Sequence, residues 1–243
     1  MNDAVRPTLA VVIPALDEES AIGPAVAEIL GVVRCQDLPA VWRGVYVVDN
    51  GSADRTAARA AGAGANVVAE PRRGYGRACL SGVLAADADL IVLMDGDGSD
   101  RPDELPRLLA PLLAGEADLV VGSRTLGHHE PGSLLPQQLV GNWIAARLLR
   151  LLYGVRITDV GPFRVVRRDD LLSLGMREMT YGWSVEMIAR AARRGLRVRE
   201  VPVSYRKRAG GESKVSGNLR ASVRAGWRIT ATILRCRWDT RDA

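Results

Sequence analysis

The chain has 243 residues, of which 47% are hydrophobic and 25% are charged, and its formal net charge is +5. These proportions are ordinary for a globular protein and exclude a wholly disordered chain. The three cysteines contain no CxxC pair, which argues against a disulfide framework and against a thiolate zinc site.

Short apolar runs alternate with Ala- and Leu-rich stretches of helical length over the first half of the chain. The runs predict strands at Leu9–Ile13, Val45–Val48, Asn66–Ala69, Leu90–Met94 and Leu119–Val121. The stretches between them predict helices near 19–33, 54–63, 75–86 and 102–114. This alternation is typical of an α/β fold with an open, mainly parallel sheet flanked by helices.

The second half of the chain has a different character. A Gly- and Pro-containing loop is expected at 125–138, and a helix at Leu139–Tyr153. Further along we expect a helix at 183–194, a strand at Leu196–Tyr205, a basic Gly-rich loop at Arg206–Gly217 and a last helix near 218–235. Arginines crowd this region, a pattern that fits a solvated face as well as contacts with phosphate groups or an anionic membrane.

Acidic residues follow several of the predicted strands. Asp17 and Glu18 come after the first, Asp49 after the second, and Asp95 and Asp97 after the fourth. The carboxyl ends of parallel strands meet at one edge of the sheet, where ligands of such folds bind. Carboxylates gathered there repel one another unless a cation lies among them, so the sequence predicts a divalent metal site.

The spacing Asp95-x-Asp97 suits one ion, because in an extended chain residues i and i+2 point the same way. Carboxylates favour a hard cation, Mg²⁺ or Mn²⁺, which also binds diphosphate oxygens. An EF-hand is excluded because the twelfth position of the loop is Pro106. A dinucleotide-binding fingerprint is also excluded, because Pro14 and its neighbours stand where the glycines would be.

Eight segments together resemble family 2 glycosyltransferases with a GT-A fold, in particular the dolichyl- and polyprenyl-phosphate mannose synthases. In chain order they are VVIPALDEES, VVDNGSADRT, RRGYGRACLSG, MDGDGSDRPDEL, LVVGSR, ITDVGPFRVVRR, YGWSVEMIARAARRGLRVREVPVSYRKR and GGESKVSGN. The resemblance implies one GT-A domain over residues 1–243, with residues 1–124 binding the nucleotide sugar and residues 125–243 on the acceptor side. It also implies C-terminal helices and a basic, mobile loop.

The resemblance assigns roles to individual residues. Pro14, Asp17, Glu18 and Asp49 would line the nucleoside pocket, with Asp49 accepting a hydrogen bond from the base. Asp95 and Asp97 would hold the metal against the donor diphosphate. Arg124, Arg206 and Lys214 would contact phosphate, and Lys214 belongs to the loop that closes over the donor.

The acceptor implied by the resemblance is polyprenyl phosphate, and the reaction is an inverting transfer of a hexose from GDP-mannose or a UDP-hexose. A phosphate acceptor is already ionised and needs no strong base, whereas a hydroxyl of a soluble metabolite would need a carboxylate within reach. Asp159 and Glu186 are the candidates for that base. Both also have structural interpretations, Asp159 in a turn and Glu186 beside an arginine.

The remaining expectations concern where the protein acts. No signal peptide precedes the first strand, and Arg147 and Arg150 interrupt the longest apolar stretch, so we expect a cytoplasmic chain. The helix at Leu139–Tyr153, with Trp143, is compatible with peripheral contact at the inner face of a membrane. A nucleic-acid-binding module is disfavoured because aromatic residues are few and the acidic edge opposes a phosphate backbone.

Overall fold

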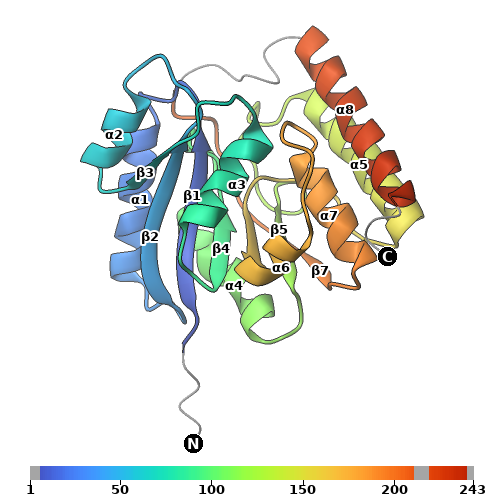
Figure 1. Cartoon of the computed structure of the whole chain (residues 1–243), viewed down its shortest axis with the longest axis horizontal. Coiled ribbons are helices and arrows are strands. Elements are labelled where there is room, and N and C mark those ends of the chain that lie inside the picture. The colour runs from blue at the N-terminus through green and yellow to red at the C-terminus, as the bar shows by residue number, and fades with distance from the viewer. Residues whose placement is uncertain (1–5, 211–218, 240–243) are drawn as a thin grey trace, which may run out of the picture.

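The computed structural model describes residues 6–210 and 219–239, with side chains in the last helix from Arg224 onward. Within these ranges seven strands form one sheet in the order β3-β2-β1-β4-β6-β5-β7 (Figure 1). Neighbouring strands run parallel except at β6, which is antiparallel to both β4 and β5. The expected open, mainly parallel sheet is therefore confirmed.

The strands are β1 Thr8–Ala15, β2 Val41–Asp49, β3 Asn66–Ala69, β4 Leu90–Leu93, β5 Leu119–Ser123, β6 Arg164–Arg167 and β7 Val198–Pro202. The helices are α1 Ile22–Cys35, α2 Thr56–Gly62, α3 Tyr75–Ala85, α4 Leu105–Leu113, α5 Pro136–Tyr153, α6 Arg168–Ser173, α7 Trp183–Arg193 and α8 Leu219–Trp238, and a short 3₁₀ helix at Pro102–Glu104 precedes α4.

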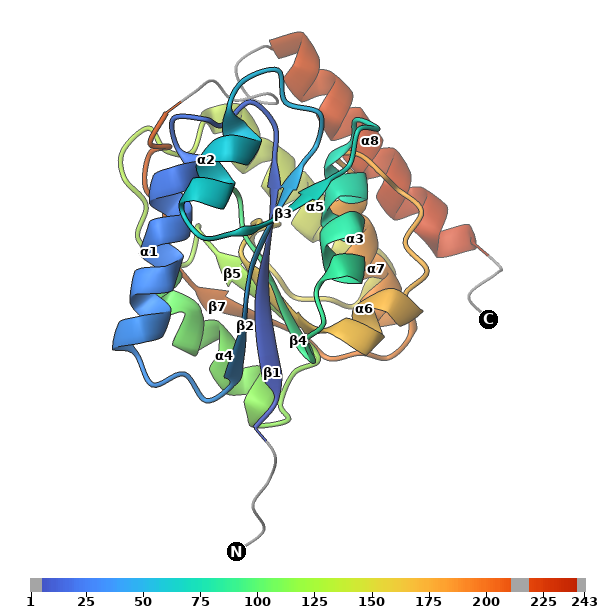
Figure 2. The ribbon, with the colours of Figure 1, turned by 60° about the vertical axis from the view of Figure 1, so that its left-hand side comes forward.

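The sheet lies between two layers of helices (Figure 2). Helices α1, α2 and α4 pack on one face, and α3, α6 and α7 pack on the other. Leu105, Leu108 and Leu112 are buried at i, i+3 and i+7, which aligns the apolar face of α4 with the sheet. Burial of each such leucine contributes about 2 kcal/mol. Outside the second layer, α5 and α8 lie side by side, and α8 also packs on α7.

Two short elements were not predicted from the sequence. The strand β6 contains only two apolar residues, Val165 and Val166, between charged ends, so it lacks the apolar run that revealed the other strands. The six-residue helix α6 follows it directly. Several predicted boundaries also shift. The helix α1 begins at Ile22 and the strand β2 at Val41, α5 begins at Pro136, because proline suits the first turn of a helix, and β7 covers only Val198–Pro202.

The antiparallel direction of β6 matters for the functional site. Residues that lead into β6 arrive at the same edge of the sheet as the carboxyl ends of β1, β2, β4, β5 and β7, and we call this edge the carboxyl rim. Gly122 at the end of β5 donates its N–H to the Phe163 carbonyl, 2.8 Å away, which fixes that approach. Of the described helices, none has the length and apolar character to cross a bilayer.

Candidate active site

The loops after β1 and β2 are bonded to each other at the carboxyl rim. Asp17 has a positive φ of 51°, and its Oδ1 accepts the Ala53 N–H at 2.7 Å. The Glu18 N–H donates to Thr56 Oγ1 at 2.8 Å, and Asp49 Oδ1 accepts the Ser52 N–H at 3.0 Å.

Pro14 is paired with Val48 at the end of the β1–β2 ladder. The four residues expected in the nucleoside pocket, Pro14, Asp17, Glu18 and Asp49, are therefore brought together.

The acidic motif follows β4 as a turn. The sequence analysis placed Asp95 and Asp97 on extended chain, but β4 ends at Leu93 and the chain turns at Gly96 and Asp97. Asp97 Oδ1 accepts both the N–H and the hydroxyl of Ser99, at 2.9 and 2.5 Å. The Asp95 N–H donates to Asp100 Oδ2 at 3.1 Å. The turn thus gathers three carboxylates, one more than the sequence analysis considered.

These carboxylates are in an unfavourable environment. Burial, together with the neighbouring Asp97, raises the pKa of Asp95, and burial with the neighbouring Asp95 raises the pKa of Asp100 above its usual range. Asp100 is 2% exposed, and its Oδ1 has no hydrogen-bond partner among the described residues. A cation held by Asp95 and Asp97 would relieve the repulsion among the three carboxylates, so these two residues fit a hard metal ion.

Within residues 6–210 and 219–239, no three His, Cys, Asp or Glu side chains converge closely enough to form a complete metal cage. An ion bound by Asp95 and Asp97 would therefore need further oxygen ligands from a substrate or water, as Mg²⁺ sites commonly have.

The segment after β7 returns over the acidic motif. Arg206 donates its N–H to the Ser99 carbonyl and its Nε to the Gly98 carbonyl, at 3.0 and 2.5 Å, and it also pairs with Glu28. These contacts tie Arg206 to the motif itself.

Arg208 is a residue that the sequence analysis noticed only as part of the basic region. Its Nη2 lies 2.7 Å from Glu18 Oε1, and its Nη1 lies 3.8 Å from Asp97 Oδ2. It therefore bridges the loop after β1 and the acidic motif. Lys214, expected in the closing loop, lies outside the described residues.

Asp159 lies in the segment that leads into β6 and is completely buried. Its two oxygens accept Nε and Nη2 of Arg124, at 2.7 and 2.8 Å, and Asn142 of α5 donates to it at 2.6 Å. The guanidinium of Arg124 also lies over the Tyr205 ring, 4.9 Å from its centroid. Burial alone would raise the pKa of Asp159, but Arg124 outweighs it, and the pKa is lowered. Asp159 is thus an ionised, fully engaged carboxylate.

Glu186, the other candidate base, is also buried and paired. Its Oε1 accepts Arg190 Nε at 2.8 Å, and its Oε2 accepts the N–H groups of Arg177 and Glu178 at 2.9 and 2.6 Å. All these partners belong to α7 or to the segment before it. This arrangement fits the structural interpretation of Glu186.

The segment between β3 and α3 closes another side of the rim. Asn50 is buried and donates to the Glu70 and Arg72 carbonyls, both at 2.9 Å, and it accepts the Gly74 N–H at 2.7 Å. The Tyr75 hydroxyl then lies 3.5 Å from Asp95 Oδ1. Neither Asn50 nor Tyr75 was selected from the sequence, although both fall within the segments that carry the family resemblance.

Arg164 is a buried cation behind the acidic motif. It is 1% exposed and donates to the carbonyls of Gly161, Val160 and Ser184, at 2.7, 3.2 and 3.4 Å. Burial lowers its pKa, while its charge favours the ionised form of Asp95. The sequence analysis missed it because it missed β6.

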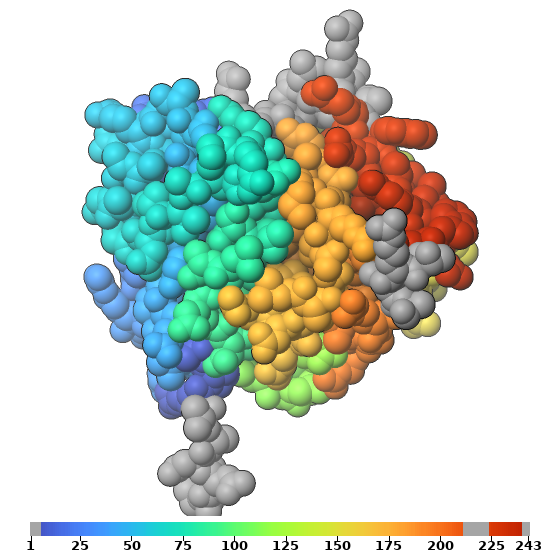
Figure 3. Space-filling model, viewed as in Figure 1, coloured from blue at the N-terminus to red at the C-terminus, as the bar shows by residue number. Residues whose placement is uncertain are grey.

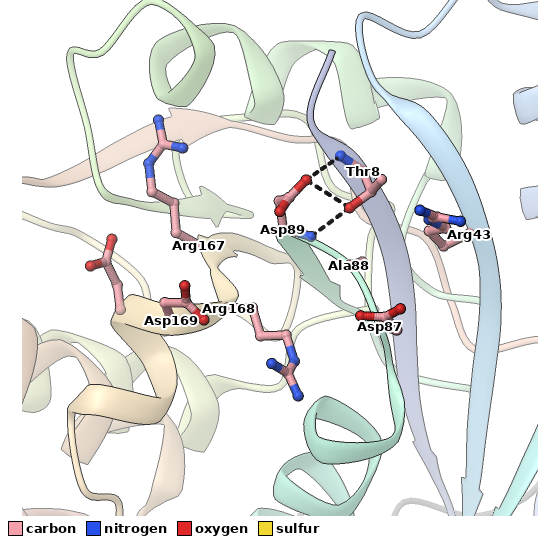
Figure 4. A pocket seen from close by; sticks show the side chains of 9 residues that line it. Thr8, Arg43, Asp87, Ala88, Asp89, Arg167, Arg168 and Asp169 are labelled. Carbon is pink, nitrogen blue, oxygen red and sulfur yellow. Dashed lines mark hydrogen bonds between the residues drawn. The ribbon is translucent and has the colours of Figure 1, made fainter. Parts of the chain in front are cut away.

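The hollow in Figure 4 lies at the opposite end of the sheet, where the parallel strands begin. Its volume is about 380 Å³, and its walls include Thr8, Arg43 and Asp89. Thr8 donates its N–H and hydroxyl to Asp89 Oδ2, at 2.7 and 2.8 Å, so these polar groups join β1 to the start of β4. The hollow therefore holds none of the predicted site residues.

The fold and the rim together are those of an α/β enzyme whose ligands bind at the carboxyl ends of the strands, and the comparison with known families identifies its class. The family model described as glycosyl transferase family 2 matches residues 10–175. The chain belongs to this family, and its sheet and helices have the GT-A architecture. The resemblance inferred from the sequence segments is confirmed, and the protein is a glycosyltransferase.

Two relatives and one solved structure illustrate this similarity. An uncharacterized glycosyltransferase of Mycobacterium tuberculosis is 43% identical over 88% of this chain and 92% of its own length. The polyprenol monophosphomannose synthase of Mycolicibacterium smegmatis is 34% identical over 81% of this chain and 80% of its own. Glucosyl-3-phosphoglycerate synthase from Mycobacterium tuberculosis, in complex with Mn²⁺, UDP and phosphoglyceric acid, has a TM-score of 0.76 and 25% identity, covering 96% of this chain and 79% of that one.

Proposed function

We propose that this glycosyltransferase moves a hexose from GDP-mannose or a UDP-hexose to polyprenyl phosphate, with inversion at the anomeric carbon. The observation that carries the proposal is the convergence at one rim of the acidic motif, Asp95 and Asp97, with Arg124 and Arg208. Negative groups suited to a metal-bound diphosphate thus lie beside positive groups suited to phosphate. The polyprenol monophosphomannose synthase among the relatives supports the lipid acceptor.

The donor would bind to residues 1–124. Pro14, Asp17, Glu18 and Asp49 would form the nucleoside side of the site, and Asp95 and Asp97 would hold Mg²⁺ or Mn²⁺. When bound, such an ion neutralises charge that develops on the departing nucleoside diphosphate. The Mn²⁺ and UDP in the similar synthase structure support this assignment.

The acceptor would bind on the side formed by residues 125–243. Arg124 gives Nε and Nη2 to Asp159, which leaves Nη1 to bind an acceptor phosphate oxygen. That oxygen attacks the anomeric carbon as the bond from this carbon to the donor phosphate breaks. The nucleoside diphosphate leaves with the bonding electrons, and no proton has to be removed from the acceptor. The chain's task is then to position two anions against each other, which Arg124 and Arg206 would assist.

The burial and the contacts of the two candidate bases agree with an acceptor that has no proton to remove. Asp159 and Glu186 are both buried and bonded to arginines, so neither is poised to take a proton from a hydroxyl. We accordingly propose a positioning role for Asp159, which holds Arg124, and a structural role for Glu186. Transfer to a lipid would also place the protein at the inner face of a membrane, on the cytoplasmic side.

A panel of GDP- and UDP-sugars, each with and without a short polyprenyl phosphate and with Mn²⁺ or chelator, tests the proposal. We expect a lipid-linked sugar with one donor, and its loss with chelator. Donor hydrolysis with no lipid product under any condition would contradict the acceptor, and full activity in excess chelator would contradict the metal.

A second candidate is the same donor chemistry directed at a hydroxyl of a soluble metabolite. It is favoured by the similar synthase, whose structure contains phosphoglyceric acid. That acceptor is itself phosphorylated, so Arg124 could bind it in the same manner. Transfer to phosphoglyceric acid or a related phosphorylated hydroxy acid, with none to polyprenyl phosphate, would favour this candidate.

A further inference from the structure

The outer faces of α5 and α8 carry large apolar side chains that the fold leaves in water. On α5, Trp143 and Leu151 are 64% and 80% exposed, and on α8, Trp227 and Trp238 are 72% and 70% exposed. Val140 and Leu234 continue the two rows. Isolated exposed apolar residues are common on proteins, but three exposed tryptophans on two adjacent helices form a patch that calls for a partner.

The rows lie opposite the packed sides of their helices. Trp227, Leu234 and Trp238 stand at i, i+7 and i+11 on one face of α8, whereas Ile233 and Cys236 are buried in the core. Likewise Ala145 and Leu149 of α5 are buried in the same core cluster, and Val140 and Leu151 face away from it. Helices α5 and α8 lie side by side at one side of the molecule, where α8 forms part of the surface (Figures 1 and 3). The two rows therefore lie on neighbouring helices, each on the side away from the core.

Arginines border this surface. Arg147 lies with its guanidinium 6.0 Å from the centroid of the Trp143 ring, Arg150 follows one turn later, and Arg237 is exposed beside Trp238. Within the described parts of the chain, these three arginines form no ion pair with a carboxylate. The sequences of α5 and α8 contain no Asp or Glu. The two helices are therefore apolar, rich in tryptophan and basic on this side, and the acidic groups next to α8, Glu178 and Asp239, are already paired with arginines.

We propose that the α5–α8 surface docks on an anionic lipid bilayer, an inference that rests on the proposed transfer to a lipid acceptor. Tryptophan favours the interface between headgroups and acyl chains, and each arginine near an anionic bilayer adds to the attraction. The first half of α5 also contacts the site, through Asn142 and Asp159. A bilayer against this surface would lie next to the acceptor side of the carboxyl rim.

A second copy of this chain fits the surface poorly. A symmetric contact would place the arginines of α5 and α8 against those of the partner, and neither helix has an acidic side chain to compensate. Anionic phospholipids supply the opposite charge together with an apolar layer. Charge complementarity therefore selects the bilayer over self-association.

The test is co-sedimentation of the full chain with vesicles of phosphatidylcholine, with and without phosphatidylglycerol. We expect binding that requires phosphatidylglycerol and weakens with salt. Arg147→Gln combined with Arg237→Gln should lower the partition about thirty-fold, and Trp227→Ser on the order of ten-fold. Arg34→Gln on α1 and Leu84→Ser on α3, which are exposed elsewhere, are the matched controls and should bind as the wild type does.

Equal binding by the surface variants and the wild type, or no vesicle binding at all, would overturn the proposal. So would dimerisation that Trp227→Ser abolishes in the absence of vesicles. Transfer to a short, water-soluble polyprenyl phosphate separates this inference from the function, because the surface variants should retain it. Vesicle binding without any lipid-linked product would contradict the proposed function while leaving the docking surface intact.

Discussion

Asp100 and Asp159 are 2% and 0% exposed, so both carboxylates are cut off from bulk water, yet their surroundings are opposite. Asp159 accepts hydrogen bonds from the side chains of Arg124 and Asn142 and from backbone N–H groups, and its pKa is lowered. Asp100 lies beside Asp95, keeps one oxygen without a partner among the described residues, and its pKa is raised.

This difference in surroundings distinguishes a buried charge that stabilises the fold from one that is suited to bind a ligand. The Arg124–Asp159 pair is compensated within the chain and organises loops from β5, β6 and α5. The acidic motif is only partly compensated, by Arg164 behind it and by Arg208 at 3.8 Å from Asp97, and a bound cation would relieve the remaining repulsion. Perturbed carboxylates that lack an internal counter-charge are the ones expected to serve a ligand. The predictions that follow test this distinction.

The largest effect is expected for Asp97→Asn. Loss of one carboxylate removes charge that a metal–diphosphate complex requires, and we expect sugar transfer to fall about a thousand-fold or more. Thermal stability should be unchanged or higher, because repulsion with Asp95 is removed. Steady-state transfer and a melting curve measure the two effects. Near-normal turnover by this variant would contradict the metal role.

In contrast to Asp97→Asn, Asp159→Ala should lower the stability of the fold. It leaves the buried Arg124 guanidinium without its partner, which costs about 3 kcal/mol of unfolding free energy. Denaturant unfolding measures this loss. The matched control is Asp159→Asn, which retains the shape of the side chain and should destabilise less. An Asp159→Ala protein as stable as the wild type would contradict the stabilising role of the Arg124–Asp159 pair.

Glu186→Gln separates the base and structural interpretations of Glu186. The amide keeps an acceptor for the N–H groups of Arg177 and Glu178 but loses the charge opposite Arg190, so we expect a loss of about 1.5 kcal/mol in stability. The turnover number with a phosphate or a hydroxyl acceptor should be unchanged. A fall in turnover with the hydroxyl acceptor alone would support the interpretation of Glu186 as the general base.

Arg208→Gln tests the bridge between Glu18 and the acidic motif. Loss of one charge-assisted bond should raise the KM for the donor about ten-fold, with a smaller change in turnover. Donor titrations at saturating acceptor measure the shift. Arg199→Gln, whose partner Glu116 lies away from the rim, is the control. Equal KM values for the donor in Arg208→Gln and Arg199→Gln would contradict a role of Arg208 in donor binding.

The smallest effect concerns pH. Because folding lowers the pKa of Asp159, its contribution to stability is present above the unfolded-state pKa of about 3.9 and is lost as the pH falls through the lower folded value. The stability difference between wild type and Asp159→Asn should therefore be constant at neutral pH and shrink below about pH 4. Melting temperatures across this range measure it. A constant difference down to the lowest pH would contradict the ionised pair.

The sequence by itself determined the α/β class, six of the seven described strands and the family. The strands β1, β4 and β5 are continuous apolar runs buried almost throughout, and such runs are visible without knowledge of their neighbours. It also located Asp95 and Asp97, because residues that follow parallel strands must gather at one rim.

Only the tertiary structure decided the rest. The strand β6 is held by its neighbours β4 and β5 rather than by its own pattern, and its reversed direction delivers Asp159 and Arg164 to the site. Whether a carboxylate such as Asp159 or Asp100 is paired depends on residues distant in the chain, since Arg124 and Asn142 reach Asp159 from separate elements. Local sequence specifies the charge of a side chain, whereas its compensation is set by contacts that exist only after folding.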